Sequence, residues 1–328
     1  MTIRLGLIGL GNWGHKLAAT IGKLDGVDLA SCFARSIDAR ADFADSYGCR
    51  PARSVDDLLT DDLDGVLVAT PHSTHVELIE VVARAGLNVM VEKPLALTVS
   101  DARRCVVAAE TAGVILQVAQ YRRRLPATRA VKQLIDSGAI GTLYLVEGHF
   151  SRIWGPQTER PWRDDPTESP AGAMTALGVH MADNLLYWAG PAVRLSALSN
   201  RMGFHAGIDD ITGALIEFES GVVGTITTSL RTPKLVNCAA HGSQIVASSE
   251  MDGLQLKTLT GNDDEETDRR YEPFDAVADN LAHFVECIRT GSQPETDGEA
   301  GVAVVEILEA MTLSAASNGA TVELADLR

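Results

Sequence analysis

The chain has 328 residues and a formal net charge of −16 at pH 7. An acidic protein of this kind repels phosphate backbones and anionic lipids, so we expect no nucleic-acid partner and no membrane partner. The five cysteines lack a C-x-x-C pair and a zinc spacing, and no apolar stretch approaches the ~20 residues of a membrane span. These features predict a cytoplasmic protein with reduced thiols, no metal site and, at 45% hydrophobic residues, enough apolar material for two cores.

Residues 2–118 show the rhythm of repeated βαβ units. Short apolar runs alternate with helical patterns, and the runs are IRLGLIG, VDLASCF, GVLVAT, NVMVE and VILQV. These runs are apolar throughout rather than alternating, which is typical of a parallel sheet covered by helices on both faces. We therefore predict a doubly wound α/β domain over residues 1–120.

The pattern changes after residue 120. In order, we expect a helix at 126–137, a strand at 142–150, several strands at 193–257, helices at 276–290 and 297–318, and a last short strand, TVEL. Strands that follow one another without helices indicate an antiparallel or mixed sheet, with Gly221 as a hairpin turn. The charged run GNDDEETDRR at 261–270 is expected to be a solvated loop. We assign residues 121–328 to a second domain.

A glycine motif follows the first apolar run. Gly9, Gly11 and Gly14 form a G-x-G-x-x-G pattern around Asn12 and Trp13, at the start of a predicted helix. Gly9 would permit a tight turn, Gly11 would let a pyrophosphate approach the backbone, and Gly14 would let the helix pack close to the strand. A glycine turn without a ligand is the alternative. The position in the first βα unit favours a dinucleotide site.

The end of the second predicted strand bears on the choice of dinucleotide. NAD sites usually carry an acid about 20 residues after the glycines, which accepts hydrogen bonds from the ribose hydroxyls. Here Ala34 stands in that place, followed by Arg35 and Ser36, with Arg40 one turn further on. A guanidinium and a hydroxyl suit a 2′-phosphate, so we favour NADP over the alternative, NAD.

The run VMVEKP ends another predicted strand of the parallel sheet. Ligands of such sheets bind outside the carboxyl ends of the strands, so Lys93 is expected to face the nicotinamide, with Pro94 fixing the turn. An ammonium there can protonate a carbonyl oxygen as hydride arrives. In reverse, the neutral amine can take the alcohol's proton if desolvation lowers the pKa of the lysine. Glu92 would orient the loop or the cofactor. An exposed, ion-paired lysine is the alternative.

At this point the sequence resembles a known family. The segments LIGLGNWG, VLVATPHSTHVEL, AGLNVMVEKPLALT and ALGVHMAD are similar, in order and spacing, to the glucose–fructose oxidoreductase, inositol dehydrogenase and MocA family. The resemblance implies a Rossmann domain followed by an α/β domain with an open, predominantly antiparallel sheet. It also implies reversible hydride transfer on sugars, polyols and related small molecules, and a homo-oligomer, a dimer or tetramer.

The resemblance also assigns roles to residues. Lys93 matches the family's catalytic lysine, and His180 matches its active-site histidine. Thr70, Pro71 and His75 match the segment that lines the nicotinamide side of the cofactor. We accordingly predict Lys93 and His180 as catalytic and substrate-binding residues.

One position departs from the family pattern. The family usually has an aspartate four residues before the histidine, whereas this chain has Ala176. Helical periodicity places His180 on one face with Ala176, Asp183 and Asn184. A lone histidine on such a face is more often a core residue. The missing aspartate at position 176 therefore supports a rival interpretation, in which the chain is a dinucleotide-binding regulator without turnover.

Two further features remain open from the sequence. Trp162 and Arg163, between prolines, would offer the substrate a flat apolar surface and a cation, or they belong to an ordinary connector. The run QYRRR at 120–124 is either an interdomain ion-pair network or an anion-recognition site. We favour the structural interpretation of this arginine cluster.

Overall fold

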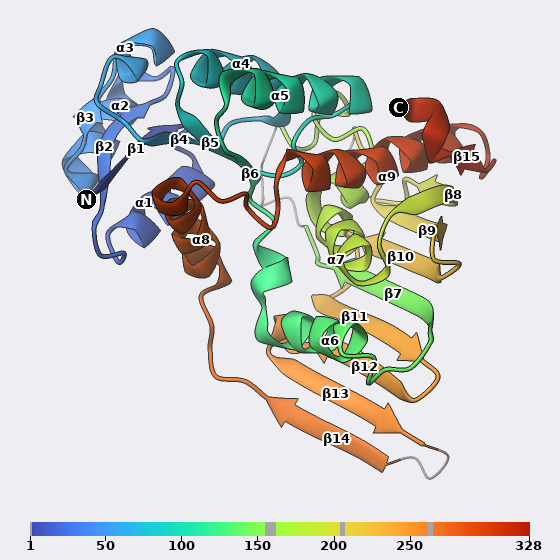
Figure 1. The fold of residues 1–328 in the computed structure, drawn as a ribbon. Coiled ribbons are helices and arrows are strands. Elements are labelled where there is room, and N and C mark those ends of the chain that lie inside the picture. Colours follow the sequence, from blue (N-terminus) through green and yellow to red (C-terminus); the bar gives the residue numbers. More distant parts are fainter. Residues whose placement is uncertain (1, 155–161, 204–206, 262–264) are drawn as a thin grey trace. The chain divides into compact units, whose positions relative to one another are not determined.

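The computed structural model describes residues 2–154, 162–203, 207–261 and 265–328 (Figure 1). The chain divides into two compact units. The first comprises Met1–Ala96, Ser100–Gln120 and Asp275–Val302, and the second comprises Leu97–Val99, Tyr121–Phe274 and Ala303–Arg328. No helix in the described part of the chain is long and apolar enough to cross a membrane.

The first unit holds a parallel sheet of six strands. Their order across the sheet is β3-β2-β1-β4-β5-β6, and every neighbouring pair is parallel. The strands are β1 (Ile3–Ile8), β2 (Val27–Phe33), β3 (Arg50–Pro51), β4 (Gly65–Val68), β5 (Asn88–Val91) and β6 (Leu116–Val118). The doubly wound prediction is confirmed, and the strand order reverses between β1 and β4. Only the two-residue β3 was missed by the sequence analysis.

Helices cover both faces of this sheet. They are α1 (Asn12–Ile21), α2 (Ile37–Tyr47), α3 (Val55–Leu59), η1 (His72–Thr74), α4 (His75–Arg84), α5 (Val99–Ala112) and α8 (Ala276–Thr290). In Figure 1, α4 and α5 lie along one face and α1 and α8 along the other. We assigned 276–290 to the second domain, but α8 packs on α1 and belongs to the first unit. Phe284 of α8 is fully buried and lies near Gly65 of β4, so the apolar face of α8 completes this core.

The second unit holds a sheet of nine strands in the order β14-β13-β12-β11-β7-β10-β9-β8-β15. They are β7 (Leu143–Ser151), β8 (Ala192–Asn200), β9 (Ile211–Phe218), β10 (Val223–Ser229), β11 (Leu235–Gly242), β12 (Ile245–Glu250), β13 (Gln255–Thr260), β14 (Glu265–Arg270) and β15 (Val322–Glu323). Only the pair β7 and β10 is parallel among these neighbours. The hairpin between β9 and β10 is confirmed, with Gly221 at φ +82°.

One prediction in this sheet was wrong. Within the charged run 261–270, residues 265–270 form the edge strand β14, paired with β13, rather than a solvated loop. An edge strand bonds to one neighbour only, so charged side chains can extend along it into water, and they protect the edge from pairing with other chains.

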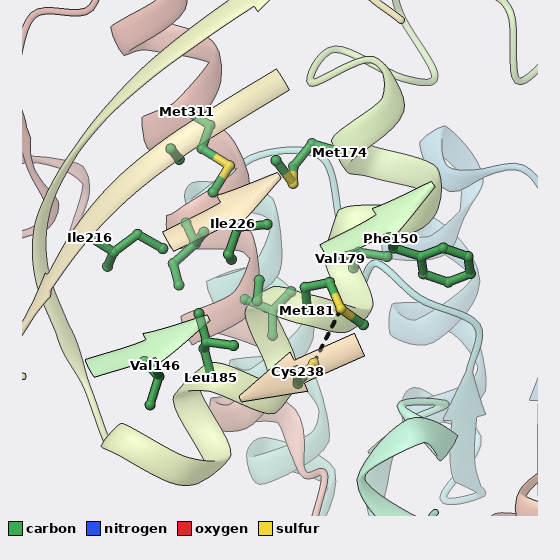
Figure 2. Close-up of a cluster of buried hydrophobic side chains, with 14 of the residues drawn as sticks. Val146, Phe150, Met174, Val179, Met181, Leu185, Ile216, Ile226, Cys238 and Met311 are labelled. Atoms are coloured by element: carbon green, nitrogen blue, oxygen red, sulfur yellow. Dashed lines mark hydrogen bonds between the residues drawn. The ribbon is translucent and has the colours of Figure 1, made fainter. Parts of the chain in front are cut away.

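The helical elements of the second unit complete its core. They are η2 (Tyr121–Arg124), α6 (Pro126–Asp136), η3 (Met174–Gly178), α7 (Val179–Ala189), η4 (Met251–Gly253), α9 (Gly298–Ala316, its first residues in the first unit) and η5 (Leu324–Leu327). Figure 2 shows side chains of α7 meeting those of the central strands. Met181 of α7 and Cys238 of β11 lie at its centre, with their sulfur atoms 3.3 Å apart. Helices thus bury one face of the sheet.

Candidate active site

The three glycines of the first unit have three different environments. Gly9 has φ +98°, and a Cβ on it would lie 2.4 Å from the carbonyl oxygen of Ala69. A Cβ on Gly14 would lie 2.2 Å from the carbonyl oxygen of Gly9, whereas one on Gly11 would meet no atom within 4 Å. Gly9 and Gly14 are therefore required by the fold itself. Gly11 is not, and the open space beside it fits the predicted approach of a pyrophosphate.

The helix that follows begins without a side-chain cap. Gly11 is the N-cap of α1 in an extended conformation, and the first turn contains no acidic residue. The first backbone N–H groups of α1, including that of Asn12, thus have no capping side chain and suit an anion. Trp13 lies in the same turn, with the Lys16 ammonium 4.8 Å from its ring centre. This end of the helix concentrates positive charge where the cofactor phosphates are predicted.

The loop after β2 carries the residues predicted to select the dinucleotide. Ser36 is the N-cap of α2, and its Oγ accepts a hydrogen bond of 3.2 Å from the N–H of Ala39. Arg35 is exposed and makes no hydrogen bond or ion pair within the described part of the chain. An exposed guanidinium next to a helix N-terminus can pair with a phosphate, which Ala34 does not repel.

Arg40 differs from Arg35. Its Nη1 donates hydrogen bonds to the carbonyl oxygens of Ala52, at 2.7 Å, and Arg53, at 2.9 Å. Its guanidinium carbon lies 5.4 Å from the ring centre of Phe33. Arg40 therefore ties α2 to the segment after β3, and its predicted contact with the cofactor stays a prediction.

The end of β5 places Lys93 as the sequence suggested. The N–H of Glu92 donates to the carbonyl oxygen of Val68, at the end of neighbouring β4, with a length of 2.8 Å. Glu92 is 8% exposed and Lys93 is half-buried. The Lys93–Pro94 peptide bond is cis. Lys93 thus follows the last ladder bond of β5, on the carboxyl edge of the sheet.

His75 lies beneath the loops that end β4 and β5. Its ring is fully buried, with Nδ1 3.0 Å from the carbonyl oxygen of Pro94 and Nε2 3.2 Å from that of Thr70. Thr74 Oγ1 donates to Thr70 Oγ1 at 2.7 Å and holds the turn that begins at Pro71. His75 therefore links the segment 70–74 to the Lys93–Pro94 loop. The predicted contact of His75 with the cofactor stays a prediction.

His180 belongs to the second unit and is 4% exposed. Its ring centre lies 5.3 Å from that of Tyr121, edge on at 64°, and 6.2 Å from that of Phe150. The helix that carries it is not uniform, because residues 174–178 form a π-helical turn before α7. Such turns are frequent at functional sites and could not be foreseen from α-helical periodicity. Ala176 lies within this turn and is partly buried.

The next acid along α7, Asp183, does not replace the missing aspartate. Arg123 Nε donates to its Oδ2, and Arg123 Nη2 lies 2.8 Å from its Oδ1. Arg122 Nη2 lies 2.8 Å from Asp252 Oδ1. Burial works against the ionised form of Asp252, but Arg122 and then Lys234 hold its pKa below the ordinary value. The structural interpretation predicted an interdomain network, but these ion pairs of Arg122 and Arg123 both lie inside the second unit.

Trp162 and Arg163 stack on each other in the second unit. The guanidinium carbon lies 4.2 Å from the tryptophan ring centre, and both side chains are half-exposed. Residues 155–161 of the same loop lie outside the described residues. A role of this pair in substrate binding stays a prediction.

The fold and these sites define a dinucleotide-binding oxidoreductase of two units. The chain belongs to the GFO/IDH/MocA family. The model of an oxidoreductase family with an NAD-binding Rossmann fold matches residues 3–120, and that of the GFO/IDH/MocA C-terminal domain matches residues 128–247.

Relatives and solved structures agree with this assignment. The chain is 30% identical over 308 residues to 1,5-anhydro-D-fructose reductase of Ensifer adhaerens, covering 91% of this chain and 92% of the relative. It is 27% identical over 334 residues to inositol 2-dehydrogenase of Rhizobium meliloti, covering 96% and 98%. A proposed NADPH-dependent oxidoreductase of Desulfitobacterium hafniense has the same fold, with a TM-score of 0.93, 26% identity and coverage of 100% and 99%.

Proposed function

We propose that this chain transfers a hydride between NADP(H) and a secondary alcohol or carbonyl group of a sugar, polyol or related small molecule. Its family makes it an NAD(P)-dependent oxidoreductase, and relatives are named as sugar and inositol dehydrogenases and reductases. The observation that carries the proposal is that the predicted residues follow three adjacent strands of the parallel sheet. The glycine turn follows β1, Thr70 and Pro71 follow β4, and Lys93 follows β5.

The residues present fit a dinucleotide, because Gly11 leaves open space beside an uncapped helix N-terminus. When bound, the nicotinamide supplies or accepts the hydride. Lys93 would donate a proton to the reacting oxygen during reduction, and its neutral amine would take that proton during oxidation. His180 would hydrogen-bond the same oxygen or its neighbour. Trp162 and Arg163 are proposed to contact the rest of the substrate.

The coenzyme preference rests on the loop after β2. Arg35 is exposed and carries a charge that no other described residue neutralises, and Ser36 adds a hydroxyl at the start of α2. Both favour the 2′-phosphate of NADP, and neither offers the ribose-binding carboxylate that NAD sites use. The test is the ratio of the dissociation constants of NADPH and NADH, measured by fluorescence. Tighter binding of NADH would contradict the preference.

A second candidate is a dinucleotide-binding regulator without turnover, which Ala176 supports. Lys93 and His180 argue against it, because a protein that only binds the cofactor needs neither. The experiment is a panel of sugars, inositols and diketones, followed by the absorbance of the nicotinamide in both directions. Oxidation or reduction of any compound supports the enzyme, whereas cofactor binding without turnover on the whole panel supports the regulator.

We also propose that the open face of the nine-stranded sheet joins two copies of the chain. The helices cover one face, and the strand register places a set of exposed apolar side chains on the other. They are Leu145, Leu198, Leu215, Val223 and Leu235. Exposed apolar side chains that share one face of a sheet are typical of an association site. Light scattering should give twice the chain mass or more, and Leu215→Glu should shift it to the mass of one chain.

A further inference from the structure

The turn η2 in the second unit has no role in the function proposed so far. We propose that η2 is a buried clamp that sets the orientation of His180, with Arg123 and Asp183 as positioning residues. The proposal rests on the role of His180 proposed above. All the residues that it uses lie within the second unit.

The clamp contacts one face of α7 at two points. His180, Asp183 and Tyr187 are spaced i, i+3 and i+7 along the helix, so they share that face. The rings of Tyr121 and His180 meet edge to face, with their centres 5.3 Å apart. Arg123 bonds to Asp183, and its guanidinium carbon lies 5.1 Å from the ring centre of Tyr187.

The spacing of the two contacts matches the geometry of the two helices. Tyr121 and Arg123 are two residues apart in a 3-10 turn, which rises about 4 Å over that distance. His180 and Asp183 are three residues apart in an α-helix, which rises about 4.5 Å. The two rises are similar, which is compatible with the two observed contacts, of Arg123 with Asp183 and of Tyr121 with His180. In the proposal, the ion pair fixes η2 on α7 and thereby the place of the Tyr121 ring.

The ion pair is suited to fix an orientation. Arg123 Nε and Nη2 each lie 2.8 Å from a different oxygen of Asp183, and the two side chains are only 8% and 1% exposed. A charge-assisted hydrogen bond from Nε to Oδ2 and a close ion-pair contact of Nη2 with Oδ1 hold the guanidinium at both oxygens of the carboxylate. A lysine at the same place would supply the charge but only a single point of contact.

Arg122, the neighbouring residue of η2, acts on the other aromatic ring beside His180. Its guanidinium carbon lies 5.2 Å from the ring centre of Phe150, while its Nη2 is held by Asp252. Phe150, labelled in Figure 2, comes from β7, and its ring centre lies 6.2 Å from that of His180. Two consecutive residues of η2 thus act on the surroundings of the imidazole. Tyr121 supplies one flanking ring, and Arg122 contacts the other, that of Phe150.

The test is Arg123→Lys, with kinetics on the compound that the panel identifies. This change keeps a cation beside the buried carboxylate, whereas truncation would leave a buried charge without its partner and endanger folding. We expect a kcat per folded molecule at least about tenfold lower, a nearly constant KM and a shifted pH profile of kcat, beside any fall in melting temperature from the lost contact. A merely structural pair would change the melting temperature and leave kcat per folded molecule and its pH profile as they are.

A matched control lies elsewhere in the same unit. Arg328 also contacts both oxygens of a carboxylate, with Nε donating to Oε1 of Glu306 of α9 at 3.0 Å and Nη2 donating to Oε2 at 3.1 Å. Arg328→Lys is the same substitution. The ion pair that it weakens joins Arg328 to α9 and lies outside η2. This variant should have the kcat and pH profile of the unchanged protein. Equal losses in both variants would overturn the clamp.

A second measurement needs no substrate. In protein with isotope-labelled histidine, the imidazole signal of His180 can be assigned by its disappearance in His180→Gln. Arg123→Lys should move this signal and the midpoint of its titration, and Arg328→Lys should not. If His180→Gln keeps full turnover, the proposed catalytic role is wrong, yet the signal still tests the clamp. An unmoved His180 signal in Arg123→Lys would refute it.

Discussion

The nucleotide end of the first unit and the surroundings of His180 in the second are built from different materials. The first is made of backbone, and its shape depends on the lack of side chains at Gly9, Gly11 and Gly14. The second is made of side chains from η2, β7 and α7 packed around one imidazole. A site made of backbone is disrupted when a side-chain atom is added to it. A site made of side chains is disrupted when one of them loses its orientation.

The same difference determines whether a mutation changes folding and binding or the chemical step. Adding a methyl group at Gly9 or Gly14 forces backbone atoms apart and affects folding as well as binding. Changing a residue around His180 leaves the backbone in place and affects the chemical step through geometry. Each of the following variants separates these two kinds of effect.

The largest effect is expected at Lys93. Lys93→Met removes the group proposed to move the proton, and general acid–base catalysis contributes roughly 10²- to 10⁴-fold. We expect kcat to fall by at least about 10²-fold, with nearly unchanged cofactor affinity, because the phosphate contacts are proposed to lie at the glycine turn. Steady-state kinetics and cofactor titration measure the two quantities. Near-normal turnover would refute the mechanism.

A pair of alanine variants tests the backbone site directly. Gly14→Ala places a Cβ 2.2 Å from the carbonyl oxygen of Gly9, so the free energy of unfolding should fall by about 3 kcal/mol. Gly11→Ala meets no protein atom within 4 Å and should leave stability nearly unchanged while weakening cofactor binding. Denaturant unfolding and cofactor titration distinguish them. Equal stability losses in both variants would show that Gly11 also serves the fold.

The sequence predicted the backbone site better than the side-chain site, for a physical reason. The glycine turn lies within six residues, so local spacing sufficed to identify it. The partners of His180 are about 30 to 60 residues away along the chain, at Tyr121 and Phe150, and no periodicity connects them. The π-helical turn at 174–178 and the edge strand β14 were missed because each departs from the composition or spacing typical of its class.

A smaller effect is expected on coenzyme choice. Arg35→Ala together with Ala34→Asp removes the exposed guanidinium and adds a carboxylate that accepts bonds from ribose hydroxyls and repels a 2′-phosphate. We expect the preference for NADPH over NADH to fall by at least about tenfold, which corresponds to ~1.4 kcal/mol. The ratio of kcat/KM for the two coenzymes measures it. Arg40→Gln is a useful comparison, because Arg40 already bonds to two carbonyl groups and its loss should act through stability.

The smallest effect is expected at Ala176, where the chain departs from its family. Ala176→Asp introduces a carboxylate into a partly buried π-helical turn, four residues before His180. If the site had only lost an orienting acid, the new carboxylate would favour the charged imidazole and raise turnover.

We expect the other outcome, a fall in activity of a few-fold through KM. Lys93 and His180 are retained. We therefore expect a working site, and our hypothesis is that its substrate fills the space near Ala176. A carboxylate in that space would be poorly solvated and would hinder the substrate. Ala176→Asn, of nearly the same size without the charge, separates crowding from electrostatics. A clear gain in kcat/KM with Ala176→Asp would show that the acid was simply missing.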